Sequence, residues 1–147
     1  MAIRFAVQDI NFELPEEVKV KKWLSEVIFR RGKQVGNISY LFCGDEYLLG
    51  VNRQYLNHDT YTDIITFDYV SADLISGDIM ISVDRVGENA NTFGVPFENE
   101  LHRVIVHGVL HLLGQGDKSD EEAKVMRRLE EDALTLWNTM FHEKRNS

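Results

Sequence analysis

The stretch "HGVLHLLGQGDKSD", residues 107–120, joins a helix pattern to a loop and to the start of another helix. Histidines four residues apart in an α-helix project from one face, about 6 Å apart along the axis, so His107 and His111 can converge on one cation. Gly114 follows the last apolar residues, where a left-handed residue commonly ends a helix. The loop after Gly114 then brings the carboxylate of Asp117 back toward the two histidines. The stretch predicts a metal site on a helix and the following loop.

A pair of histidines on an apolar helix face has an alternative explanation, because such side chains are often core residues satisfied by hydrogen bonds. Taken alone, the pair favours that alternative. Three features favour a metal: Gly108 removes a side chain beside His107 where something must approach closely, Gly114 ends the helix one turn after His111, and the loop brings Asp117 back within reach. Asp117 could instead cap the last helix, although Ser119 is better placed for that role.

The chemistry expected of such a site is hydrolysis. Three protein ligands leave a fourth coordination position open, which is typical of catalytic rather than structural zinc. A metal in that arrangement lowers the pKa of a bound water and polarises a carbonyl or phosphoryl oxygen. Zinc peptidases carry a glutamate directly after the first histidine as the general base, whereas this chain has Gly108 there, so a peptidase is disfavoured.

Hydrophobic periodicity along the rest of the chain predicts short strands early and helices late. The predicted strands cover residues 3–8, 36–44, 62–70 and 76–83, and the predicted helices cover residues 14–32, 45–57, 84–94, 96–114 and 119–140. Gly50 weakens the second helix, and Ser119 with Glu122 forms a capping box for the last one. The pattern predicts one α+β domain over residues 1–147, with about five helices on a mixed sheet of about four strands.

Composition indicates an ordinary globular protein with an acidic surface. The chain has 24 Asp and Glu against 16 Lys and Arg, which gives a formal net charge of -8. Nucleic-acid binders tend to be basic, so RNA binding would rest on local features. Six cations gather in one early segment, where a solvated helix face is the commoner explanation; they are Lys19, Lys21, Lys22, Arg30, Arg31 and Lys33.

The cellular compartment is predicted from features that are missing. The N-terminus lacks the pattern of a signal peptide, and the apolar run at residues 104–113 is too short to span a bilayer. The lone Cys43 cannot form an intramolecular disulfide, and a small buried hydrophobe is favoured over a catalytic thiol. We expect a cytoplasmic protein that does not bind membranes. His58 and His142 are expected at the surface.

Three linked segments resemble the YbeY family of bacterial endoribonucleases and ribosomal-RNA maturation factors. "HGVLHLLG" is similar to the family motif H-G-x-L-H-L-x-G-Y-D-H, and "GDIMIS" matches its G-D-I strand. "VNRQYLNHDTYTDIITF" is similar to the family segment L-N-x-x-Y-R-x-K-D-x-P-T-D-V-L-S-F. The segments follow in the same order and spacing over residues 51–117, with Asp63 and Asp78 at the T-D and G-D-I positions, although either can simply cap a turn or brace the fold.

The resemblance implies one zinc ion per chain, held by His107, His111 and Asp117. Asp117 occupies the position of the family's third histidine. A carboxylate is a harder ligand than imidazole, so Mn²⁺ or Fe²⁺ are further options. The family arginine in the upstream segment, which is thought to help bind or cleave RNA, falls on Leu56. Arg53 and Arg103 are candidate phosphate contacts in its place, although a salt bridge with Glu100 is the commoner role for Arg103.

These observations lead to an expected function and two alternatives. The expected function is a metal-dependent, single-strand-specific endoribonuclease in 16S ribosomal-RNA maturation and ribosome quality control, with ribosomal RNA and small-subunit ribosomal proteins as partners. One alternative is a ribosome-assembly or RNA-binding factor whose metal is structural. The other is a metallohydrolase of another substrate class. No general acid or base can be chosen from the sequence.

Overall fold

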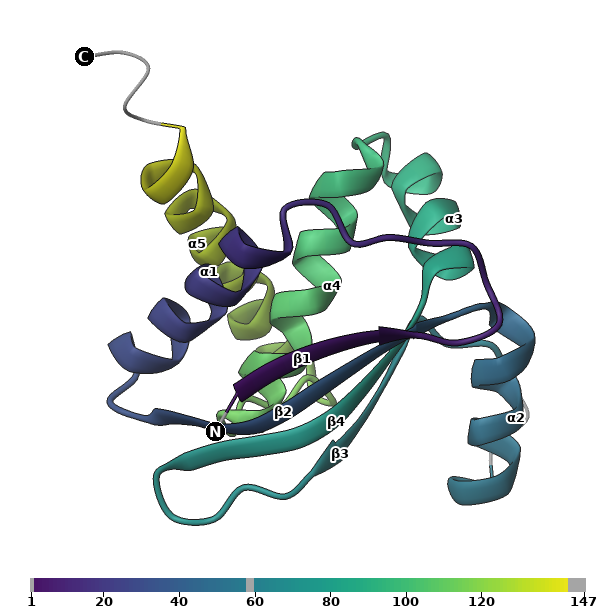
Figure 1. Cartoon of the computed structure of the whole chain (residues 1–147), viewed down its shortest axis with the longest axis horizontal. Helices are drawn as coiled ribbons and strands as arrows, with labels where there is room; N and C mark the ends of the chain where they lie inside the picture. Colours follow the sequence, from purple (N-terminus) through teal and green to yellow (C-terminus); the bar gives the residue numbers. More distant parts are fainter. Residues whose placement is uncertain (1, 58–59, 143–147) are drawn as a thin grey trace.

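Four strands form one mixed sheet, and most of the helices cover one of its faces (Figure 1). The computed structural model describes residues 2–57 and 60–142, so His58 lies outside the described residues. The elements along the chain are β1 (Ala2–Val7), α1 (Glu17–Arg30), β2 (Gln34–Cys43), α2 (Asp45–Tyr55), β3 (Ile64–Asp68), β4 (Leu74–Ser82), α3 (Val83–Phe93), α4 (Phe97–Leu112) and α5 (Asp120–Phe141).

The strand order in the sheet is β1-β2-β4-β3. β1 runs parallel to β2 and β2 runs parallel to β4, whereas β3 pairs antiparallel with β4. The prediction of an α+β fold with a four-stranded mixed sheet and five helices is therefore confirmed. β3 lies at one edge of the sheet, next to β4 alone.

α4 is the central helix, because apolar residues occur nearly all around it. It packs against α3, α5 and the β3–β4 side of the sheet (Figure 1). The Tyr40 hydroxyl of β2 donates to the Ile105 carbonyl at 2.6 Å, which ties the sheet to the middle of α4. The position of the histidines is thus fixed by the hydrophobic core.

Gly108 allows α4 to lie directly on the sheet. A Cβ at this residue would stand 2.9 Å from Ile79 Cδ1 and 3.3 Å from Ile64 Cδ1. Gly77 in β4 does the same from the other side, since a Cβ there would stand 2.8 Å from Leu112 Cδ2. The expectation that something approaches closely at Gly108 is confirmed, but the group that approaches is the sheet, so Gly108 gives no support to a metal.

The ends of the helices follow the local signals in the sequence. Ser119 and Glu122 form the predicted capping box at the start of α5. Gly114 has a φ of 101° just after the C-cap of α4, as expected for a left-handed residue there. α2 continues through Gly50 without a break. Pro96 is the N-cap of α4 rather than its first residue, because its ψ of 148° is extended.

The second face of the sheet is covered by α2 at one end. A small apolar cluster joins α2 to this face, and its buried members are Cys43, Leu48, Val51 and Ile65. Burial raises the pKa of the Cys43 thiol to about 11, with help from the nearby carboxylates of Asp84 and Asp45. The thiol is therefore protonated at neutral pH, which confirms that Cys43 is a packing residue.

Candidate metal centre

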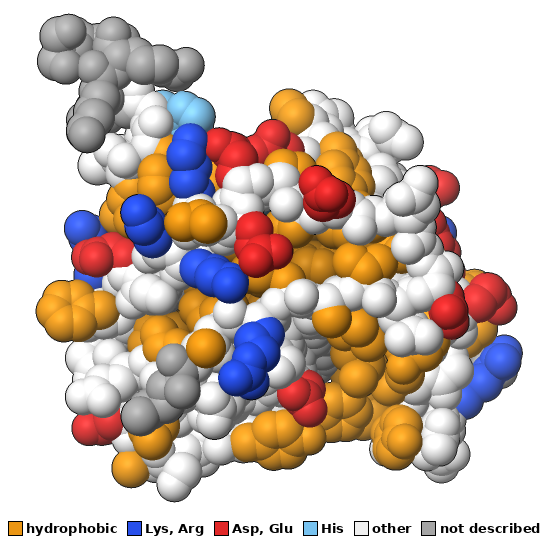
Figure 2. Space-filling view, in the orientation of Figure 1, with side chains coloured by type: hydrophobic (Ala, Val, Ile, Leu, Met, Phe, Trp, Pro, Cys, Tyr) orange, Lys and Arg blue, Asp and Glu red, His pale blue; other side chains and the backbone are white. Residues whose placement is uncertain are grey.

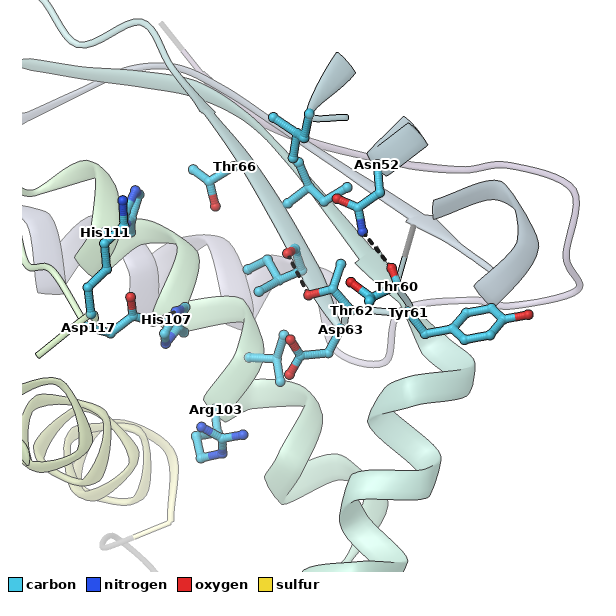
Figure 3. Close-up of a pocket in the computed structure, with 15 residues that line it drawn as sticks. Asn52, Thr60, Tyr61, Thr62, Asp63, Thr66, Arg103, His107, His111 and Asp117 are labelled. Carbon is cyan, nitrogen blue, oxygen red and sulfur yellow. Dashed lines mark hydrogen bonds and ion pairs between the residues drawn. The ribbon is translucent and has the colours of Figure 1, made fainter. Parts of the chain in front are cut away.

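A cavity of about 810 Å³ lies between α4, the loop that follows it, β3 and the segment that precedes β3. His107 and His111 extend from α4 on one side, and Asp117 lies beside them (Figure 3). Thr62 and Asp63 face them from the other side (Figure 3). The structure thus places all three predicted metal ligands on the wall of a single cavity.

His107 is the best oriented of the three. Its Nδ1 lies 2.6 Å from Glu130 Oε2, and its Nε2 lies 3.3 Å from Asp117 Oδ2. Glu130 is 3% exposed and comes from α5, so it fixes the ring from the side of the core. A histidine that ligates a metal commonly donates its other ring N–H to a carboxylate in this way.

The separation between His107 Nε2 and Asp117 Oδ2 suits two ligands of one ion. Two atoms that share a tetrahedral zinc ion, each about 2.0–2.2 Å from it, stand roughly 3.3–3.6 Å apart. The observed 3.3 Å lies at the lower end of that range. The same pair can form a direct ion pair when the imidazole is protonated.

The excess of negative charge around His107 also favours the binding of a cation. Arg103 binds Glu130 through Nη1 at 2.9 Å and Glu100 through Nε at 2.9 Å, and both carboxylates are buried. One arginine therefore faces two carboxylates, which leaves negative charge that a cation at His107 would balance. Asp117 adds a further carboxylate at the mouth of the cavity.

The pKa values of the pair reflect this network. Burial alone would lower the pKa of His107, but the hydrogen bond and charge of Glu130 raise it above its ordinary value. Burial alone would raise the pKa of Glu130, but His107 and Arg103 lower it. Glu130 is thus ionised and holds a proton on His107 Nδ1, which turns the Nε2 edge toward Asp117.

His111 does not meet the other two ligands as closely. It is half-buried and lines the same wall one helical turn beyond His107. Within residues 2–57 and 60–142, no three His, Cys, Asp or Glu side chains are already arranged to hold a metal ion. The structure brings together His107 and Asp117, and places His111 beside them on the cavity wall.

The candidate phosphate contacts behave differently from one another. Arg103 lines the cavity but makes the ion pair with Glu100 that its spacing predicted, and a second one with Glu130. Arg53 is exposed on the last turn of α2, outside the group of described side chains that line the cavity. Leu56, at the position of the family arginine, does line it.

Glu130 is the residue that sequence reasoning missed. It follows Met126 by four residues and precedes Ala133 by three, so it lies on the buried stripe of α5. A carboxylate on such a stripe needs a buried partner, because an unpaired buried charge is costly. A carboxylate on the buried stripe of α5 was thus the sign in the sequence that Glu130 has a buried partner. Nothing in the sequence indicated that the partners would be His107 and Arg103.

The two family aspartates have different surroundings. Asp63 lines the cavity, where burial raises its pKa, and Asn89 Nδ2 donates to its Oδ2 at 3.3 Å. Asp78 lies in β4 opposite Phe67, outside the group of described residues that line the cavity. Asp63 is therefore part of the site wall, and Asp78 belongs to the sheet.

The early run of cations does not form a basic patch. Four of its six members pair with carboxylates, three of them within α1 and its N-cap and one in the turn between β3 and β4, and Figure 2 shows blue and red side chains close together over α1. The pairs are Lys19 with Glu16, Lys21 with Glu17, Arg30 with Glu26 and Lys33 with Asp73. The solvated helix face expected from the sequence is what the structure contains.

The fold and the cavity define a small α+β domain with a histidine helix packed on a mixed sheet beside an open cavity. The family model described as "Endoribonuclease YbeY" matches residues 5–138. The chain therefore belongs to the YbeY family, and the prediction of an endoribonuclease is confirmed at that level. Within the described residues, none of the helices is both long and apolar enough to cross a bilayer.

Individual relatives agree with the family match. A protein named Endoribonuclease YbeY from Flavobacterium psychrophilum is 53% identical over 94% of this chain and 96% of its own length. One of the same name from Porphyromonas gingivalis is 49% identical over 91% of this chain and 89% of its own length. A solution structure from Thermotoga maritima superposes with a TM-score of 0.64 at 26% identity, covering 95% of this chain and 93% of that one. These relatives do not favour the two alternative functions.

Proposed function

We propose that this chain is a metal-dependent endoribonuclease that cuts single-stranded ribosomal RNA, in 16S maturation and ribosome quality control. The observation that carries the metal centre is the geometry of His107, whose Nδ1 is held by buried Glu130 while its Nε2 faces Asp117 at 3.3 Å. RNA as the substrate is supported by the name of the family and of its members.

The metal would be held by His107, His111 and Asp117. When a divalent metal is bound at such a site, it supplies an acidified water and polarises a phosphoryl oxygen. Zn²⁺ suits two imidazoles and a carboxylate, and the carboxylate also leaves Mn²⁺ and Fe²⁺ as options. One ion per chain fits the donors that His107, His111 and Asp117 provide on the cavity wall.

The chain's own residues orient the site and shape the space for substrate. Glu130 fixes the ring of His107, and Arg103 supports Glu130 from the other side of its carboxylate. The cavity has a volume of about 810 Å³, and three threonines line it: Thr60, Thr62 and Thr66. We place the protein in the cytoplasm, with small-subunit ribosomal proteins as partners that bring it to the RNA.

Replacing one ligand tests the metal centre. We expect His111→Ala to lose bound metal and to lower RNA cleavage by about a hundredfold or more, because the substitution removes one of three protein ligands. Metal content would be measured by mass spectrometry on protein prepared without chelators, and cleavage on a labelled single-stranded oligoribonucleotide.

His142→Ala is the matched control, since His142 lies at the C-cap of α5, outside the cavity. It should retain both metal and cleavage. If His111→Ala keeps its metal and its cleavage rate, the assignment of the three ligands fails. If the wild-type protein cuts no RNA with any of the three metals, the proposed substrate fails.

A further inference from the structure

The edge of β3 that faces away from β4 carries unpaired backbone groups. The Ser82 N–H donates to the Asp63 carbonyl at 2.9 Å, and the Tyr69 N–H donates to the Ser76 carbonyl at 3.0 Å, in the register that pairs Ile64 with Ile81. In an antiparallel ladder, hydrogen-bonded and non-bonded positions alternate. The backbone groups of the even-numbered residues of β3 therefore point away from the sheet; these residues are Ile64, Thr66 and Asp68.

The candidate catalytic cavity lies along this open edge. Ile64 and Thr66 line the cavity, whereas Asp68 is outside the group of described residues that do so. Thr66 lies opposite His111 in Figure 3. A strand of substrate in the cavity would thus run between β3 and the histidines of α4.

Beside the candidate metal ligands, the edge presents the outward N–H groups and carbonyls of Ile64 and Thr66. The Thr62 hydroxyl donates to the outward carbonyl of Ile64 at 3.3 Å, which occupies one of the two lone pairs of that oxygen. Among the hydrogen bonds of the described residues, neither N–H group has a partner, so both are left to donate. An added peptide strand would need both the donors and the acceptors of the edge, whereas phosphate oxygens need donors only.

The cavity offers little positive charge to attract phosphate to this acidic chain. Arg103 is engaged by two buried carboxylates, and Leu56 replaces the family arginine. Lys118 also lines the cavity, but so do the carboxylates of Asp117 and Asp63. Neutral donors are therefore the groups best able to bind phosphate here, since they add affinity without the need for positive charge.

We propose that the substrate strand lies along the open edge of β3, with its phosphate oxygens accepting hydrogen bonds from the backbone N–H groups of Ile64 and Thr66. This inference rests on the proposed endoribonuclease function. It assigns positioning of the RNA to main-chain donors in a chain that lacks the family arginine.

A proline substitution tests the inference, because proline removes an N–H and is tolerated in an edge strand where that N–H points outward. We expect Thr66→Pro to weaken binding of a fluorescent single-stranded oligoribonucleotide by about tenfold, as for one lost hydrogen bond to a charged group. Binding would be followed by fluorescence anisotropy with a chelator present, so that the RNA is not consumed.

Asp68→Pro serves as the control. It removes an outward N–H of the same edge beyond the cavity, and it should bind within about twofold of wild type. Should Thr66→Pro not fold, backbone NMR of the wild type replaces it, and RNA should shift the amides of Ile64 and Thr66 more than that of Asp68.

The possible outcomes separate this inference from the proposed function. Folded Thr66→Pro that binds RNA as tightly as wild type, or amides of Ile64 and Thr66 that do not respond to RNA, would overturn it even if wild type cuts RNA. Capture of an extended peptide by the edge in place of RNA would also overturn it. Wild type that neither binds nor cuts RNA would instead remove the proposed function.

Discussion

At the scale of single residues, the arrangement around His107 depends on Glu130. The carboxylate binds two groups at once, His107 through Oε2 and Arg103 through Oε1. Breaking a buried pair by removing one partner is costly, because the other charge is left uncompensated. Glu130 therefore couples the orientation of a candidate ligand to the packing of α5 on α4.

Neutralising this carboxylate should weaken metal binding. We expect Glu130→Gln to lower the affinity for Zn²⁺ by about tenfold, because a neutral amide holds the His107 N–H less strongly and reduces the basicity of Nε2. Isothermal titration calorimetry with Zn²⁺ measures the effect without reference to activity. Glu131→Gln, which changes the exposed neighbour, should bind as wild type does; equal affinities for the two variants would refute the role of Glu130.

The sequence predicted the residues of the site better than their arrangement. His107 and His111 follow from the helix period alone, and the loop after Gly114 brought Asp117 within reach of His107 as expected. The contact between Glu130 and His107 joins residues 23 positions apart, and no local rule fixes how two helices cross. Arg103 was assigned two roles, and only tertiary contacts could show the two ion pairs that engage it.

At the scale of elements, α4 lies close to the sheet because of two glycines. Gly108 of α4 faces the sheet, and Gly77 of β4 faces α4. Gly108 and Gly77 stand where a Cβ would meet Ile79 and Leu112. Periodicity gave the helix, its buried stripe and its end at Gly114, because those are local properties. The meaning of Gly108 was missed because the sequence does not show which side of a helix faces a sheet most closely.

The contact of Gly108 with the sheet can be measured by adding one methyl group. We expect Gly108→Ala to lower the free energy of unfolding by about 1–3 kcal/mol, because overpacking outweighs the helix propensity of alanine. Gly50→Ala is the matched control: its Cβ would meet nothing within 4 Å, so it should stabilise α2 by about 0.5–1 kcal/mol. Urea unfolding would measure both, and a stabilised Gly108→Ala would contradict the packing argument.

At the scale of the whole molecule, His102 joins three helices. Its ring lies 5.5 Å from that of Trp23 in α1 and 4.2 Å from that of Trp137 in α5, measured between centroids. The histidine is 4% exposed, and burial lowers its pKa from 6.5 to about 4 although Glu16 acts in the opposite direction. The spacing in the sequence placed this histidine away from the site, and the structure places it in the core.

The buried imidazole should make the protein less stable in acid. Below about pH 6.5 the unfolded chain binds a proton at His102 that the folded chain does not bind until about pH 4, so the free energy of unfolding falls as the pH falls through that window. The full effect is about 3 kcal/mol. Urea unfolding of wild type and His102→Phe at several pH values would check this, and equal slopes against pH would rule it out.

The contact between Gly108 and the sheet also bears on how this protein can evolve. A single-nucleotide change can turn a glycine codon into a glutamate codon, which at this position would create the peptidase motif. The new carboxylate, however, would enter the space held by Ile79 and Ile64 instead of the open cavity. One nucleotide change is therefore enough to write the peptidase motif into the sequence of α4, but the packing of α4 on the sheet disfavours the protein that would result.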